Sequence, residues 1–504
     1  MSVSCQVPHL CYIAKLPGET LSKIFMLAAH GSLKQSETYE IAPQSVTMPD
    51  VLALVNRHWR RVALSDTGLW STLSIDLHKM TGNKTEVGWT WLTTMIRRSG
   101  RSSVDIIIKA QQGAVSGREE WRHWDFTPTM CRFADCMPAV FNLLFPEMYR
   151  WRSLDIISDT WMPLCSALNF LNERRTEGSG ALRLESIKLT RTNDALSFFW
   201  HFRPRFIQTV EGIPFAALMG ANLQDVTAQT PHLPKLRNIS LYGVHLNWTA
   251  FHLSTLLSAT QTPSLTPARH CIQSLELSQH SGEVRPSFDE FSGILKACPY
   301  LQHLVIRASG PLPGRPSYLV SLPLLQRLHY EFPLVGDPAE LFSGLHAPNL
   351  IKLSIGKSFT CKKLTYEEDD EDDEDEDGPA NSLLRYCATH RPFPKLQELS
   401  LNRVTAPVEA FSLFMASIPT LLHLSLLGTP KALQALTPIQ DPLSGSGVPC
   451  PVLESIQIFP KTRWFDLVDV LRERRKCAPR FAEWQCREVM SDGFMVSFED
   501  DKSR

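Results

Sequence analysis

Apolar residues recur through most of this chain in a short unit whose first, fourth and sixth positions are apolar and whose other positions are mostly polar. The alternation at the end of the unit is typical of a half-buried β-strand. Ten units occur between residues 151 and 460, several of them 24 or 25 residues apart. This period predicts a stack of short units that together bury one continuous core. The units begin at Trp151, Leu184, Leu236, Ile272, Leu301, Leu325, Leu350, Leu396, Leu421 and Leu453.

Prolines and helical segments separate these strands. In seven of the ten units a proline stands two residues before the first apolar position, where it would end a preceding helix. One such helix is predicted after the capping box of Ser287 and Glu290, and another over residues 406–417. The repeated unit therefore predicts an α/β fold with parallel strands on a concave face and helices or loops on a convex face. The seven prolines are Pro234, Pro299, Pro323, Pro348, Pro394, Pro419 and Pro451.

Residues 16–77 follow a helical period instead. Apolar residues three and four positions apart place Leu21, Ile24 and Phe25 on one face of a first helix, and the same spacing recurs over residues 51–62. A module of about sixty residues has little apolar area to bury, so we expect it to lean on a neighbouring part of the chain.

The order of residues in this module resembles the F-box. It reads Leu-Pro-x-Glu-x-Leu-x-x-Ile-Phe, then Val-x-Arg-x-Trp-Arg-x-Val-Ala, then Leu-Trp. The resemblance implies an all-α module that binds the Skp-family adaptor of a cullin–RING ubiquitin ligase. Asn56 stands where many members carry Cys, residues 30–49 form a long polar link, and an unrelated pair of amphipathic helices is the alternative. The residues implied to bind the adaptor are Leu16, Pro17, Leu21, Ile24, Phe25, Val55, Trp59 and Trp70.

The repeat array resembles the irregular leucine-rich repeats that follow an F-box in many substrate receptors. Two motifs fit that combined family: Arg150-Trp151-Arg152-Ser153-Leu154, and Trp91 followed by Arg98-Ser99-Gly100. In each predicted strand the residue between the last two apolar positions points away from the core. We expect these residues to form a concave surface for a protein substrate, although any solvated strand would show similar ones. They are Asp155, Lys188, Ser240, Glu276, Val305, His329, Ser354, Ser400, Ser425 and Gln457.

The charge of the chain is unevenly distributed. The net charge is −1, but residues 367–377 are eleven consecutive acids, and without them 51 basic and 41 acidic residues leave +10. Such a run repels itself and is expected to be a disordered spacer loop. The alternatives are that it binds a basic partner or folds back on the basic body of the chain. The basic cluster at residues 472–476 is expected to be the solvated last turn of a helix, with nucleic-acid binding or nuclear import as the alternative.

The sequence contains none of the common motifs of enzymes or metal sites. There is no Cys-x-x-Cys, no His-Glu-x-x-His, no Gly-x-Ser-x-Gly and no P-loop, so we expect no enzymatic activity, no metal and no cofactor. His245, His303, His329 and His423 lie in or beside predicted strands and are interpreted as ordinary strand or edge residues. Without a recognisable signal peptide or a long apolar run, we expect a cytoplasmic or nuclear protein whose twelve cysteines are reduced.

The preferred hypothesis is the substrate-recognition subunit of a Skp–cullin–F-box ubiquitin ligase, with the adaptor and a protein substrate as partners. The alternative is a non-catalytic leucine-rich-repeat scaffold outside a ligase; nucleic acid and membrane are not expected partners. The predicted organisation is a tail (1–15), an F-box-like module (16–77), a linker or cap (78–150), the repeat array (151–460) with its acidic loop (367–377), and a capping helix with a tail (461–504).

Overall fold

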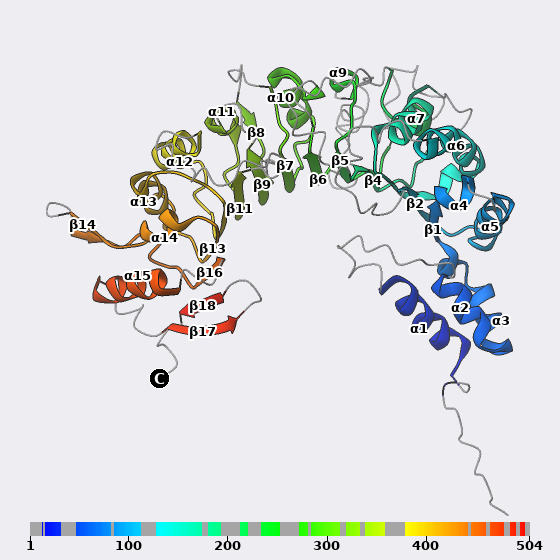
Figure 1. Cartoon of the computed structure of the whole chain (residues 1–504), viewed down its shortest axis with the longest axis horizontal. Coiled ribbons are helices and arrows are strands. Elements are labelled where there is room, and N and C mark those ends of the chain that lie inside the picture. Colours follow the sequence, from blue (N-terminus) through cyan, green and yellow to red (C-terminus); the bar gives the residue numbers. More distant parts are fainter. Residues whose placement is uncertain are drawn as a thin grey trace, which may run out of the picture.

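The chain forms an arc of strands and helices (Figure 1). The structure, a computed structural model, describes Ile13 and residues 16–31, 47–81, 85–111, 128–173, 180–192, 212–219, 233–251, 272–280, 284–312, 319–332, 338–357, 379–441, 445–459, 464–477, 484–489 and 494–498. The predicted acidic loop at residues 367–377 lies outside them.

A single sheet of 14 strands follows the arc, and the predicted α/β fold with a long parallel sheet is confirmed. The strands from β1 to β16 in this sheet pair with one another in parallel. β18 pairs antiparallel with β16 and with β17, and this hairpin ends the sheet. The sheet extends beyond residues 151–460 at both ends. Its strands are β1 (Thr72–Asp76), β2 (Val104–Ala110), β3 (Trp151–Ser158), β4 (Ser186–Arg191), β5 (Asn238–Tyr242), β6 (Ser274–Ser278), β7 (His303–Arg307), β9 (Arg327–Phe332), β11 (Lys352–Lys357), β12 (Glu398–Asn402), β13 (His423–Leu427), β16 (Ser455–Phe459), β17 (Trp484–Val489) and β18 (Phe494–Phe498).

Helices lie on the outer side of the arc and the strands on its inner side, which we call the concave face (Figure 1). Two small sheets also occur, β8 (Val320–Ser321) with β10 (Leu345–His346), and β14 (Ile439–Asp441) with β15 (Gly445–Gly447). The helices are α1 (Gly18–Gly31), α2 (Met48–Val55), α3 (Arg57–Ser65), η3 (Thr67–Trp70), α4 (Leu77–Thr81), α5 (Thr85–Arg98), α6 (Pro128–Leu144), η5 (Phe145–Arg150), α7 (Trp161–Glu173), α8 (Ala216–Met219), α9 (Trp248–Ala250), α10 (Phe288–Lys296), α11 (Pro338–Ser343), α12 (Pro379–His390), α13 (Val408–Ala416), α14 (Pro430–Gln434) and α15 (Trp464–Cys477).

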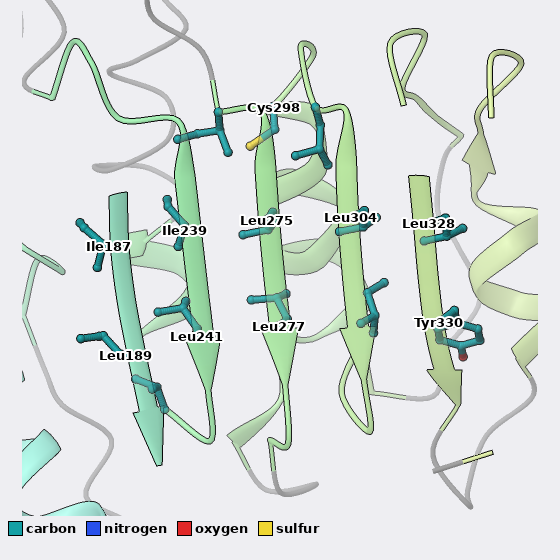
Figure 2. Close-up of a cluster of buried hydrophobic side chains, with 14 of the residues drawn as sticks. Ile187, Leu189, Ile239, Leu241, Leu275, Leu277, Cys298, Leu304, Leu328 and Tyr330 are labelled. Carbon is teal, nitrogen blue, oxygen red and sulfur yellow. The ribbon is translucent and has the colours of Figure 1, made fainter. Parts of the chain in front are cut away.

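The apolar positions of the repeated unit form continuous rows across the sheet (Figure 2). Ile239, Leu275 and Leu304 are register partners on neighbouring strands, and each is at most 1% exposed. A single strand with its helix would leave part of each such side chain in water, whereas the neighbouring units cover it. Stacking therefore supplies the core, since a fully buried Leu or Ile contributes about 1.5–3 kcal/mol.

The recurrent prolines lie in turns that lead into the strands. The Leu325 N–H donates to the Leu322 carbonyl at 3.2 Å, which places Pro323 at the second position of the turn. Proline favours that position because its ring already fixes the φ angle that the turn requires. The same bond closes all seven turns, whose donors are Leu236, Leu301, Leu325, Leu350, Leu396, Leu421 and Leu453.

One expectation about the C-terminal helix is wrong. Of the basic cluster at residues 472–476, Arg474 is buried rather than solvated. Its guanidinium donates to the carbonyls of Leu436, Pro449 and Cys450 at 3.0, 2.9 and 3.1 Å. Arg474 thus fixes α15 onto the last repeats, while the other basic residues of the cluster are exposed.

We expect Leu275→Ala to destabilise the chain by about 2–5 kcal/mol, because it leaves a cavity between two neighbouring rows of the core. The measurement is the free energy of unfolding from urea denaturation. Leu413→Ala, at a half-exposed position of α13, is the matched control and should change the free energy of unfolding little. An equal effect of both substitutions would contradict the stacked core.

Candidate functional site

The helical module consists of α1, α2, α3 and η3, which pack around a small core. Leu21, Phe25 and Trp70 are buried, and the rings of Phe25 and Trp59 lie 4.9 Å apart. The Trp70 Nε1–H donates to the Ala63 carbonyl at 2.7 Å. Three of the eight residues predicted to bind an adaptor therefore hold the module together instead of facing a partner.

The module also exposes several large apolar side chains. Ile24 and Val55, two of the predicted residues, are 44% and 53% exposed. Leu27 and Leu54 are still more exposed, at 74% and 72%, although the sequence analysis did not select them. Several exposed large apolar side chains on so small a module make its helices a candidate interaction surface. We call the set the apolar surface; it comprises Ile24, Leu27, Met48, Val51, Leu54, Val55 and Leu64.

The remaining features of the module have local explanations. Leu16 and Trp59 are partly buried against the core, and Pro17 is exposed. Asn56, where the F-box pattern often has Cys, is the N-cap of α3 and accepts a hydrogen bond from the Trp59 N–H at 2.9 Å. Asparagine is among the residues that best cap a helix, so Asn in place of Cys at this position stabilises the start of α3.

The residues predicted to line the concave face lie in one row. Each of them is the direct register partner of the next across neighbouring strands, so the row runs without interruption from β3 to β16. We call it the central row; it comprises Asp155, Lys188, Ser240, Glu276, Val305, His329, Ser354, Ser400, Ser425 and Gln457.

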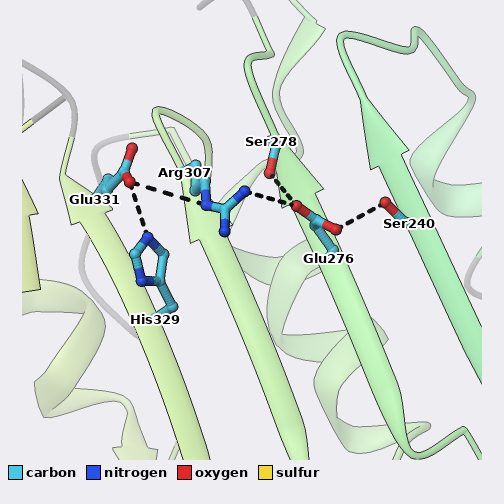
Figure 3. Close-up of polar contacts among 6 residues, drawn as sticks. All are labelled: Ser240, Glu276, Ser278, Arg307, His329 and Glu331. Carbon is cyan, nitrogen blue, oxygen red and sulfur yellow. Dashed lines mark hydrogen bonds and ion pairs between the residues drawn. The ribbon is translucent and has the colours of Figure 1, made fainter. Parts of the chain in front are cut away.

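A polar network links the middle of the central row (Figure 3). Glu276 accepts from Ser240 at 2.8 Å and pairs with Arg307 at 3.3 Å. Arg307 also lies 3.9 Å from Glu331, which is 2.8 Å from the ring nitrogen Nε2 of His329. Arg307 and Glu331 were not selected from the sequence, although they stand two positions after central-row residues and so share their face.

An open depression of about 510 Å³ lies on the concave face near the C-terminal end of the sheet. Ser400, Ser425 and Gln457 contribute to its lining, and Met495 of β18 borders it. Lys352 and Glu398, which pair at 2.7 Å, lie along one side. Small hydroxyl side chains between longer ones leave room for a partner and offer it hydrogen bonds.

Asp155 has an unusual environment at the other end of the central row. Burial raises the pKa of its carboxyl to about 6, although the charges of Lys188 and Lys109 lower it. One carboxylate oxygen is buried and has no hydrogen-bond partner among the described residues. A carboxylate kept in such a place costs stability, which makes Asp155 a candidate binding residue.

The four histidines singled out in the sequence separate into two groups. His303, His329 and His423 lie on strands β7, β9 and β13, whereas His245 is buried after β5 and stacks on Trp161 at 4.3 Å. Burial, with the charge of Arg191, holds the pKa of His245 well below its usual range. Within the described part of the chain, no three His, Cys, Asp or Glu side chains form a group that could hold a metal, and no helix could span a membrane.

Comparison with known proteins gives little further information. No protein-family model and no curated protein matches the chain. Among solved structures, a Bacteroides fragilis protein from a structural genomics consortium is similar over 42% of this chain, with 15% identity and a TM-score of 0.26. The complex of TLR13 with ssRNA13 is similar over 61%, with 12% identity and a TM-score of 0.23. The matches span 58% and 46% of those two chains, and their low TM-scores carry no argument about function.

We expect Asp155→Asn to stabilise the chain at pH 7.5 by up to about 3 kcal/mol. The folded state binds the Asp155 proton more tightly than the unfolded state, so the stability of the wild type falls as the pH rises from about 4 to about 6 and then stays level. The advantage of the variant should therefore vanish near pH 4. Unfolding free energies measured from pH 4 to pH 7.5 test this, with the exposed Asp469→Asn as control. An advantage that does not depend on pH would contradict a desolvated carboxylate.

Proposed function

We propose that this chain is the substrate-recognition subunit of a Skp–cullin–F-box ubiquitin ligase. The helical module is the F-box and binds the Skp-family adaptor, and through it a cullin. The stacked strands and helices are an irregular leucine-rich-repeat solenoid that binds a protein substrate on its concave face. The chain performs no covalent chemistry itself.

The observation that carries this proposal is the apolar surface of the helical module. Leu27 and Leu54 are almost three-quarters exposed, although their module is short of buried apolar area. A chain that needed them only for folding would turn them inward. Their exposure on a module whose sequence resembles the F-box is what an adaptor-binding surface requires.

The concave face supports the second half of the proposal. It presents an uninterrupted central row, a hydrogen-bonded ionic network and an open depression, but no metal-binding group among the described residues. Such a surface can hold a protein segment through many polar contacts. Holding a substrate near a conjugating enzyme accelerates ubiquitin transfer by proximity, which requires no reactive group on the receptor.

We expect a Leu27→Glu/Leu54→Glu variant to lose at least about 100-fold in affinity for a purified Skp-family adaptor, because charges would be buried in an apolar interface. The measurement is the dissociation constant from interferometry, after circular dichroism has shown that the variant keeps the helical signal of the wild type. The control is Leu413→Glu, which places the same charge on α13 at a residue of similar character, 49% exposed.

The control variant should bind the adaptor as the wild type does. Should the correctly folded wild type fail to bind any Skp-family adaptor, the ligase hypothesis is wrong and the alternative, a repeat scaffold outside a ligase, takes its place. Equal affinities of the wild type and the doubly charged variant would show that the apolar surface is not where the adaptor binds.

A further inference from the structure

The helical module is attached to the arc through the last turn of α5. The guanidinium carbon of Arg98 lies 4.4 Å from the centre of the Trp70 ring in η3. The same guanidinium donates to the Asp50 carboxylate in α2 at 3.2 Å. Arg98 thus contacts two separate elements of the module by two kinds of interaction, a cation–π contact and an ion pair.

The turn that carries Arg98 is itself fixed to the arc. Arg150, the last residue of η5 and directly before β3, is completely buried and reaches back to this turn. It donates to the Ser99 hydroxyl and to the Ser102 carbonyl, both at 2.9 Å, and to the Ile96 carbonyl at 3.2 Å. The bond to Ile96 satisfies a carbonyl in the last turn of α5, and the three bonds together hold this end of the helix in place.

The chain beyond α5 also fits closely against η3. Gly100 has a φ of +51°, and a Cβ there would lie 2.9 Å from the Cγ2 of Thr67. The hydroxyls of Thr67 and Ser102 lie 2.7 Å apart, and the Asp105 N–H donates to the Ser71 carbonyl at 2.9 Å. Only glycine meets both the backbone conformation and the close approach at position 100.

We infer that Arg98 is a positioning residue that fixes the orientation of the helical module relative to the concave face. The two motifs, at Arg98-Ser99-Gly100 and at Arg150, then together form a rigid joint between the helical module and the arc. The functional value of a rigid joint rests on the proposed function. A receptor accelerates ubiquitin transfer only if it holds its substrate at a defined place relative to the bound adaptor. Stiffness of the joint can be measured without any substrate.

The experiment uses the full chain with two genetically encoded spin labels, one at the exposed Arg61 of α3 and one at the exposed Leu182 before β4. The distribution of distances between the labels is measured for the wild type, Arg98→Ala and Arg97→Ala. Arg97 is the matched control, since it carries the same charge on the same turn but is exposed. We expect a distribution at least about twofold wider for Arg98→Ala and no change for Arg97→Ala.

Hydrogen exchange separates positioning from folding. We expect the amides of α1 and α3 to stay protected in Arg98→Ala, and the affinity for the adaptor to stay within about twofold of the wild type. If Arg98→Ala unfolds the module, Gly100→Ala replaces it as the test, because its Cβ would push the joint apart at Thr67. Its control is Gly428→Ala, which lies far from the joint and has a similar positive φ of +59°.

A distance distribution as narrow as that of the wild type in a folded Arg98→Ala or Gly100→Ala variant would overturn the inference. Failure of the proposed function would look different, since the wild type would not bind the adaptor while the widths of the distributions still differed between variants.

Discussion

Every unit of this chain depends on its neighbours to bury its apolar side chains. The row through Ile239, Leu275 and Leu304 is almost fully buried, with neighbouring strands on either side of it and helices on the outer side of the sheet. The ends of the sheet therefore need special elements. At the N-terminal end, β1 and β2 continue the sheet beneath α4 and α5; at the C-terminal end, the antiparallel hairpin of β17 and β18 and the helix α15, fixed by Arg474, close it.

Much of this architecture could be predicted from the sequence because two physical signals repeat in it. The alternation of apolar and polar residues fixes which side chains point inward, and it placed the whole central row on one face in continuous register. The prolines mark where each strand begins. From the sequence alone, however, a proline is equally consistent with the end of a helix and with the second residue of a turn. The hydrogen bond to the Leu322 carbonyl before Pro323 is visible only in the structure.

The candidate surfaces were harder to predict. Helical spacing grouped Leu21, Ile24 and Phe25 on one face, but it could not tell which part of a broad apolar stripe faces the core and which faces solvent. The structure turns Leu21 and Phe25 inward and leaves Ile24 and Leu27 outside. Long-range contacts, such as those of Arg98 with Trp70 and Asp50, produce no periodic pattern in the sequence and could not be predicted from it.

The two surfaces lie on different parts of one connected body, and in the proposed function each would perform one of the two tasks of a ligase receptor. The most direct test of this account is calorimetric titration of the folded wild-type chain with a purified Skp-family adaptor at several temperatures. The account predicts a one-to-one complex whose binding heat capacity change is clearly negative, because the apolar surface leaves water on binding. A folded chain that releases no heat and forms no complex at any temperature, or a complex with a heat capacity change near zero, would contradict it.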